Sequence, residues 1–171
     1  PLLGEKHTTP NNELYFLGEL QVSFLRYLQD HKVFQYIIYP GVAYIEMLLA
    51  AGRYGALQEE ISLVDLVFEK ALRLDERKGT NTQVTMTAVE KGFEVSIYSQ
   101  KEEGSWQMHA KGTVLTQSKV EKVAPINIEE IKSRCSTTIT KNDLYKHTTA
   151  AGMGLGENFQ TLERVYSGEN E

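Results

Sequence analysis

His31 stands shortly before a predicted helix start, and its type and position suit acid–base chemistry. An imidazole titrates near neutral pH, so it can accept a proton under cellular conditions. Pro40 and Gly41 open a helical pattern, and the free N–H groups of a helix start can hold negative charge that develops on an oxygen. Together these residues suit removal of a proton beside a carbonyl group. From spacing alone, a structural histidine at a strand end explains His31 better than a catalytic base does. Spacing does not distinguish a plain helix start at Pro40 and Gly41 from a site that binds an oxygen.

The elements that must position His31 are predicted from hydrophobic periodicity. Residues 33–39 are rich in β-branched and aromatic side chains and too short for a typical helix, so we expect a strand or extended loop. Pro40 then occupies the first helical turn, where a backbone N–H would have no acceptor within the helix. The helix is apolar around much of its circumference, which predicts burial. Gly52 or Gly55 is expected to end it after about three turns of ~3.6 residues.

Alternating apolar and polar residues predict several consecutive strands. Strands are expected over residues 15–24, 61–74 with breaks, 83–89, 93–99 and 106–116. Glu90, Lys91 and Gly92 join two of them as a hairpin turn. A buried helix with consecutive antiparallel strands indicates an α+β fold.

The chain changes character after Ser118. Residues 119–140 combine charges, Pro125, a short helix over 128–134 and a Ser/Thr-rich stretch, which predicts a linker. A helix starting at Asn142 or Asp143 should run through Ala150, followed by a Gly-rich loop. We therefore divide the chain into a first unit at 1–118, a linker at 119–140 and the start of a second unit at 141–171.

Composition narrows the classes of function. The chain has 171 residues, is 41% hydrophobic and carries a net charge of −5, which indicates a globular protein and argues against nucleic acid as the main partner. The single Cys135 excludes an internal disulfide, and the histidines and carboxylates lack metal-ligand spacing, so we expect no metal. No run of ~18 apolar residues or signal peptide is found. We expect a cytoplasmic protein without a membrane segment.

The residues around the helix start match a known pattern. His31, Pro40, Gly41, Tyr44 and Glu46 resemble the His-x3-Gly-x4-Pro motif and following helix of polyketide synthase dehydratase domains. At one position of the motif, Gln35 stands in place of Gly.

Two later stretches also resemble this family. Residues 106–112 resemble its Trp-x-x-His-Ala-x-Gly strand, in which we interpret His109 as structural. Residues 152–160 resemble its Gly-x-x-Tyr-Gly-Pro-x-Phe-Gln loop, with Leu155 in place of Tyr and Glu157 in place of Pro. The resemblance extends from residue 1 to residue 166.

The resemblance implies a hot-dog fold, an antiparallel sheet wrapped around a central helix. The chain would hold the first unit of a double hot dog, with the second unit incomplete. It further implies that His31 is the base and that the Gly41 N–H binds a thioester carbonyl. Asp30, next to His31, could tune the imidazole, although we expect it to face solvent. Substrate-binding residues would be Pro40, Gly41, Tyr44, Leu155, Phe159 and Gln160.

The implied reaction removes water from a β-hydroxyacyl thioester carried on acyl carrier protein. No cofactor is expected beyond the phosphopantetheine arm of that carrier. Neighbouring synthase domains and a second copy of the chain are the other implied partners. The family's general acid is an Asp in an Asp-x-x-x-Gln/His pattern, which Asp65 and Asp143 lack.

Two alternatives remain open. A pseudo-dehydratase that serves as a structural or docking module would explain Gln35, Leu155, Glu157 and the lack of the family's acidic motif. A hot-dog thioesterase would use Glu46 on the central helix to activate water.

Overall fold

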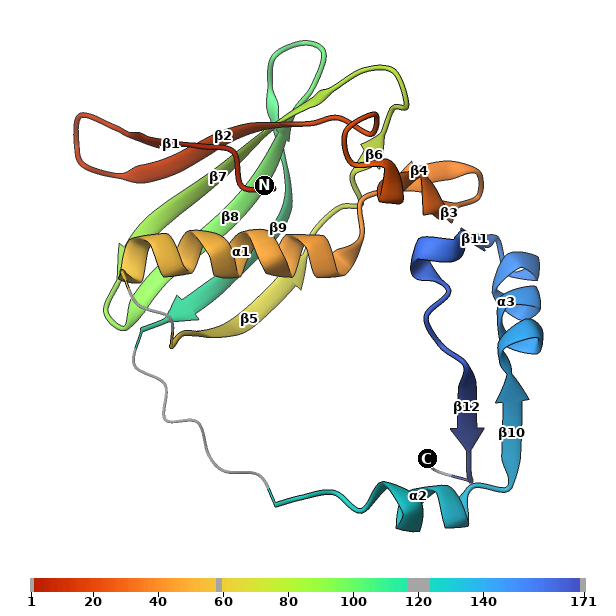
Figure 1. Ribbon diagram of the computed structural model, residues 1–171. Coiled ribbons are helices and arrows are strands. Elements are labelled where there is room, and N and C mark those ends of the chain that lie inside the picture. The colour runs from red at the N-terminus through yellow and green to blue at the C-terminus, as the bar shows by residue number, and fades with distance from the viewer. Residues whose placement is uncertain (1, 58–59, 117–123, 170–171) are drawn as a thin grey trace.

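A six-stranded antiparallel sheet dominates the computed structural model, which describes residues 2–57, 60–116 and 124–169 (Figure 1). Across the sheet, the strands are β1 (Glu5–Thr8), β2 (Leu14–Leu20), β7 (Thr80–Val89), β8 (Gly92–Gln100), β9 (Trp106–Leu115) and β5 (Ser62–Phe68). The predicted hairpin is present, with Val89 paired to Gly92. Alternation with a period of two places one face of each strand toward a common core.

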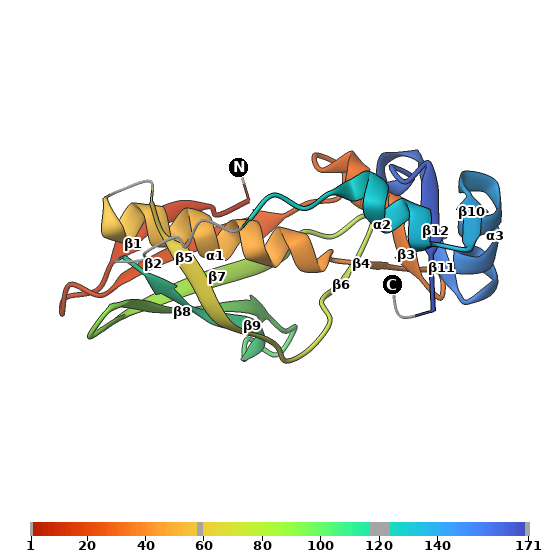
Figure 2. The ribbon, with the colours of Figure 1, turned by 90° about the horizontal axis from the view of Figure 1, so that it is seen from below.

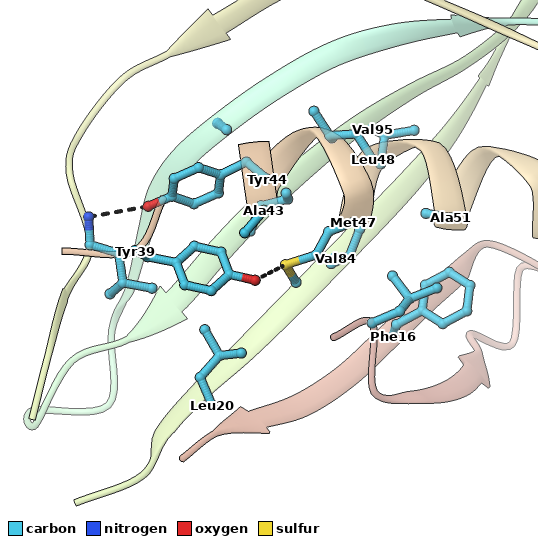
Figure 3. Close-up of a cluster of buried hydrophobic side chains, with 14 of the residues drawn as sticks. Phe16, Leu20, Tyr39, Ala43, Tyr44, Met47, Leu48, Ala51, Val84 and Val95 are labelled. Atoms are coloured by element: carbon cyan, nitrogen blue, oxygen red, sulfur yellow. Dashed lines mark hydrogen bonds between the residues drawn. The ribbon is translucent and has the colours of Figure 1, made fainter. Parts of the chain in front are cut away.

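Helix α1 (Gly41–Ala56) lies along the inner face of this sheet, as Figures 1 and 2 show from two sides. Its buried side chains include Met47, Leu48 and Ala51, and they belong to one core cluster with Val84 and Val95 of the sheet (Figure 3). Each fully buried Met, Leu or Val side chain contributes roughly 1.5–3 kcal/mol. The sheet therefore holds α1 by apolar burial, which is the α+β arrangement expected of a hot dog.

The predicted end of the helix was wrong. The helix continues through Gly52 and Gly55 to Ala56, and Leu57 caps it in the left-handed conformation with φ 53°. A Cβ on Gly52 would lie 2.5 Å from Val114 Cγ1, and one on Gly55 would lie 2.5 Å from Met86 Cε. These glycines let the helix approach the sheet closely, so they serve packing rather than helix termination.

Two strand predictions also need correction. The strand expected over 15–24 ends at Leu20, where the chain turns into the 3₁₀ helix η1 (Arg26–Asp30), and β1 was not predicted. The stretch 61–74 divides into β5 and β6 (Arg73–Leu74), which belong to different sheets. Asp65, with φ 52°, lies at the irregularity within β5.

A second, four-stranded sheet carries His31. Its order is β11 (Met153–Leu155), β3 (His31–Val33), β4 (Tyr36–Ile38) and β6. The extended run predicted over 33–39 is thus folded into a tight hairpin. Phe34 and Gln35 form its turn with φ 46° and 71°. The family motif has Gly at the second of these positions, where the left-handed conformation favours glycine.

The C-terminal part contains α2 (Ile128–Arg134), β10 (Thr137–Thr140), α3 (Lys141–Ala150), the 3₁₀ helix η2 (Glu157–Phe159) and β12 (Arg164–Ser167). The end of the predicted linker is ordered as β10, which pairs antiparallel with β12, while residues 119–123 of that linker lie outside the described residues. Helix α3 begins slightly before the predicted position because the Thr140 hydroxyl caps it by accepting from the Asp143 N–H at 3.3 Å. Among the helices of the described segments, none has the length and apolar character needed to cross a bilayer.

Candidate functional site

His31 lies where η1 ends and β3 begins, and its ring is half-buried. The ring Nδ1 lies 2.8 Å from the carbonyl oxygen of Ile38. A carbonyl only accepts hydrogen bonds, so Nδ1 must carry the proton and donate it to this oxygen. The lone pair of Nε2 is then available to accept a proton from another molecule. This tautomer is the one that a general base requires.

Leu155 and Phe159 come to His31 from the other end of the sequence. Leu155 pairs directly with His31 in the β11–β3 ladder, and the Phe159 ring centroid lies 5.0 Å from that of the imidazole. Tyr27 extends the aromatic cluster, with its ring centroid 6.5 Å from that of Phe159. The structure thus brings together three of the predicted site residues, His31, Leu155 and Phe159.

Hydrogen bonds fix the loop that carries Leu155 and Phe159. The Gln160 side-chain amide donates to the Leu155 carbonyl at 2.7 Å, so Gln160 braces the loop internally. Tyr145 of α3 donates to the Phe159 carbonyl at 3.3 Å. Pro is absent from the position of Glu157, yet the loop keeps a defined conformation as the 3₁₀ helix η2.

Asp30 holds the same loop from the His31 side, while its carboxylate stays at the surface as expected. Its carboxylate accepts from the Asn158 backbone N–H at 3.1 Å and from the Asn158 side-chain amide at 2.6 Å. These bonds favour the ionised form, so the pKa of Asp30 is lowered, first by the backbone bond and then by the side-chain bond. Asn158 was not predicted as part of the site, because it occupies a variable position of the loop motif and lies 128 positions from Asp30 in the sequence.

The helix start is tied to His31 through the backbone. The Ile38 carbonyl that accepts from the imidazole lies two residues before Pro40, which precedes the first helical residue with φ −66°. Gly41 is exposed, and within the described ranges its N–H has no hydrogen-bond acceptor. This N–H can therefore donate to an oxygen of a bound molecule.

Tyr44 has a different position from the other predicted site residues. Its ring is buried beside Tyr39 at a centroid distance of 4.9 Å, and its hydroxyl accepts from the Leu72 N–H at 3.2 Å (Figure 3). Burial raises the pKa of Tyr44 to about 12. No contact joins Tyr44 to His31 in the described structure, so its observed role is to hold the segment before β6. A part in substrate binding stays a prediction.

His109 is buried and fully paired. Its Nδ1 donates to the Lys70 carbonyl at 2.8 Å, which leaves Nε2 to accept from the Ser99 hydroxyl at 2.8 Å. Burial lowers the pKa of His109. With both nitrogens engaged, this histidine has the structural geometry that the sequence suggested.

A largely apolar cavity of about 320 Å³ lies near the aromatic cluster. It is lined by Leu2, Leu3, Leu25, Tyr27, Glu46, Met47 and Ala50. Tyr27 also packs on Phe159, so it connects this cavity to the neighbourhood of His31. His31 itself lies outside the cavity lining. Over the described ranges, no three His, Cys, Asp or Glu side chains gather as a metal site would require.

Comparisons with known proteins agree with this architecture. The chain is similar to the dehydratase domain from the CurF module of curacin polyketide synthase, with a TM-score of 0.90 and 25% identity, covering 98% of this chain and 62% of that one. It is 28% identical to polyketide synthase PksM of Bacillus subtilis (strain 168), over 85% of this chain and 4% of PksM. It is 29% identical to polyketide synthase GfsA of Streptomyces halstedii, over 97% of this chain and 2% of GfsA.

These matches confirm the expected hot-dog fold and the resemblance on which it was based. The chain spans less than two thirds of the solved curacin dehydratase domain and a small fraction of each synthase. The family model of the polyketide synthase dehydratase domain matches residues 1–100, which is more than half of the sequence. This chain therefore belongs to the polyketide synthase dehydratase family.

Proposed function

We propose that this chain supplies the base of a dehydratase that acts on a β-hydroxyacyl thioester. His31 Nε2 removes the proton from the α-carbon, and the electron pair of that C–H bond becomes the double bond between the α- and β-carbons. The β-hydroxyl departs as water after an acid protonates it. The observation that supports this role is the Nδ1–Ile38 hydrogen bond, which leaves Nε2 free to accept a proton.

The Gly41 N–H is the proposed donor to the thioester carbonyl. Negative charge grows on that oxygen as the α-proton leaves, and a preset donor lowers the barrier by about 3 kcal/mol. The free N–H at the start of α1 supports this assignment. Leu155 and Phe159 would bound the substrate beside the imidazole, and Pro40, Tyr44 and Gln160 would shape the surrounding wall.

The general acid is proposed to be an aspartate of the second hot-dog unit, in an Asp-x-x-x-Gln or Asp-x-x-x-His pattern. Asp143 is engaged with the Thr140 hydroxyl at the start of α3, and Asp65 lies at the irregularity of β5. An aspartate-to-asparagine mutant of CurK dehydratase and a histidine-to-phenylalanine mutant of CurJ dehydratase are both inactive. Those findings support a mechanism that needs one residue of each type.

The substrate is proposed to arrive on the phosphopantetheine arm of acyl carrier protein, with no other cofactor. Neighbouring synthase domains, a homodimer and a cytoplasmic location belong to the same proposal. The similarity to polyketide synthases, which contain the matched region as a small part of their length, supports the neighbouring domains.

A product assay tests the proposal and separates it from its alternatives. The complete dehydratase domain is incubated with a β-hydroxyacyl thioester, and the products are identified by mass spectrometry. We expect the α,β-unsaturated thioester, with a rate that falls about 10²- to 10⁴-fold in His31→Gln. His147→Gln, which replaces an exposed histidine of α3, is the matched control.

Two other outcomes would overturn the proposal. An unchanged substrate with both wild type and His31→Gln would favour a structural or docking module. Release of the free acid that survives His31→Gln but is lost in Glu46→Gln would favour a thioesterase.

A further inference from the structure

Asp30 and Asn158 form a clamp beside His31 that the proposed reaction does not yet use. Three hydrogen bonds join Asp30 to the loop of η2. Its carbonyl accepts from the Gly156 N–H at 2.8 Å, and its carboxylate accepts from the N–H and the side-chain amide of Asn158. A residue next to His31 in sequence therefore helps to hold a segment that lies 128 positions away.

The loop has room for this clamp only because Gly156 lacks a side chain. A Cβ at that position would collide with the Asp30 carboxylate. The clamp is thus accommodated by the local sequence on both sides, with Gly156 making space and Asn158 supplying two donors.

The clamped segment carries the ring that covers His31. Phe159 immediately follows Asn158, and its ring centroid lies 5.0 Å from that of the imidazole. Asp30 itself makes no hydrogen bond to the His31 ring in the described structure, because Nδ1 donates to Ile38 instead. Asp30 therefore does not act as the carboxylate partner of a His–Asp pair.

We propose that Asp30 is a positioning residue that acts through Asn158, holding Phe159 against the imidazole of His31. The role rests on the proposed function of His31 as a base. A fixed aromatic wall limits the orientations of the imidazole and excludes water from one of its sides, which preserves the geometry needed for proton transfer.

Two readouts test this role in the complete dehydratase domain. The first is the ¹³C–¹H spectrum of the labelled His31 ring, which the Phe159 ring current should shift, and which does not depend on turnover. The second is kcat and KM for dehydration of a β-hydroxyacyl thioester. The variants are Asp30→Ala, Asn158→Ala, the double alanine variant and the exchange Asp30→Asn with Asn158→Asp.

Asp75→Ala is the matched control. The Asp75 carboxylate also accepts from two backbone N–H groups, those of Arg77 at 2.7 Å and Lys78 at 3.0 Å, and its pKa is likewise lowered. Asp75 differs from Asp30 because it lies in the loop after β6 and makes no contact with η2 in the described structure. Any general effect of losing a loop-capping carboxylate should appear in this variant as well.

The proposal predicts that Asp30→Ala and Asn158→Ala move the His31 ring signals in the same direction as Phe159→Leu. It also predicts a roughly tenfold loss in kcat with a smaller change in KM, since a misplaced group impairs the reacting geometry. The double variant should lose no more than Asp30→Ala, and the exchange should recover part of the loss. Asp75→Ala should leave both readouts unchanged.

Unchanged His31 ring signals in Asp30→Ala would contradict the positioning role. Additive losses of kcat in the double variant would also contradict it. A large effect of Asp30→Ala with none for Asn158→Ala would instead indicate direct action on the imidazole. An inactive wild-type domain would contradict the proposed function, while the His31 signals would still decide whether Asp30 and Asn158 position Phe159. Failure of the proposed dehydratase function can therefore be distinguished from failure of the positioning role of Asp30.

Discussion

His31 and His109 carry the same side chain in opposite surroundings. His31 is half-buried and has one nitrogen bonded to a backbone carbonyl, whereas His109 is buried with both nitrogens paired. A histidine that acts as a base needs one ring nitrogen without a hydrogen-bond partner, whereas a buried structural histidine needs partners for both nitrogens. These hydrogen bonds suit His31 to the proposed role of base and His109 to a structural role.

The buried His109 should make stability depend on pH. Burial lowers its pKa, so the unfolded chain, with an ordinary histidine pKa of about 6.5, binds a proton at higher pH than the folded chain. The free energy of unfolding must then fall as the pH drops below about 6.5 toward the folded pKa. His109→Gln lacks this contribution, so its stability deficit relative to wild type should shrink between pH 7.5 and 5.5 in urea titrations. A deficit independent of pH would contradict the assignment.

Gln35 should be replaceable with a gain in stability. Its φ of 71° costs a non-glycine residue about 1 kcal/mol, so Gln35→Gly should raise the free energy of unfolding by roughly that amount. Gln29→Gly is the control, because Gln29 lies in η1 outside the positive-φ positions and should lose stability. Urea denaturation of both variants measures the difference. A loss of stability in Gln35→Gly would show that the turn does not strain this residue.

At the scale of elements, the packing of α1 against the sheet explains where sequence-based prediction succeeded and failed. Alternation identified the β7–β8 hairpin and β9, because one face of each strand is buried. The same logic missed the β3–β4 turn, since neither Phe34 nor Gln35 is a typical turn residue. The prediction that a glycine ends the helix failed at Gly52, because the close approach to Val114 explains glycine at this position.

Gly52 should tolerate no side chain. Alanine has the better helix propensity by about 1 kcal/mol, yet its Cβ would lie 2.5 Å from Val114 Cγ1, and overpacking of this kind costs about 1–3 kcal/mol. Gly52→Ala should therefore lower the free energy of unfolding despite the favourable propensity. Gly41→Ala is the control, because the new Cβ would lie at an ordinary 3.6 Å from the Phe68 ring. Equal thermal midpoints for the two variants would contradict the packing account.

For the molecule as a whole, the C-terminal part completes the neighbourhood of His31. Strand β11 adds to the sheet of β3, and η2 rests against η1 through the Asp30 clamp (Figure 1). Spacing in the sequence could not predict this meeting, because the partners lie more than a hundred residues apart and the pairing depends on tertiary structure. The family resemblance supplied Leu155 and Phe159 as candidates, whereas the link between Asp30 and Asn158 required the structure.

Tyr145 should help to keep this C-terminal part in place. Its hydroxyl accepts from the Leu162 N–H at 3.0 Å and donates to the Phe159 carbonyl. Tyr145→Phe removes both bonds, so the Leu162 amide should exchange faster with deuterated solvent, and stability should fall by about 0.5–1.5 kcal/mol for each bond. Tyr54→Phe is the control, because the exposed Tyr54 has no hydroxyl hydrogen bond in the described structure. Unchanged Leu162 exchange would contradict the bracing role.

The role of His31 as the base is tested most directly by loss of deuterium from the substrate. A β-hydroxyacyl thioester deuterated at the α-carbon is given to the complete dehydratase domain, and deuterium loss is followed beside formation of the unsaturated product. If His31 is the base, His31→Gln slows both processes together by about 10²- to 10⁴-fold, whereas replacing the exposed His147 by Gln changes neither. Deuterium loss at the wild-type rate in His31→Gln would show that another group removes the α-proton.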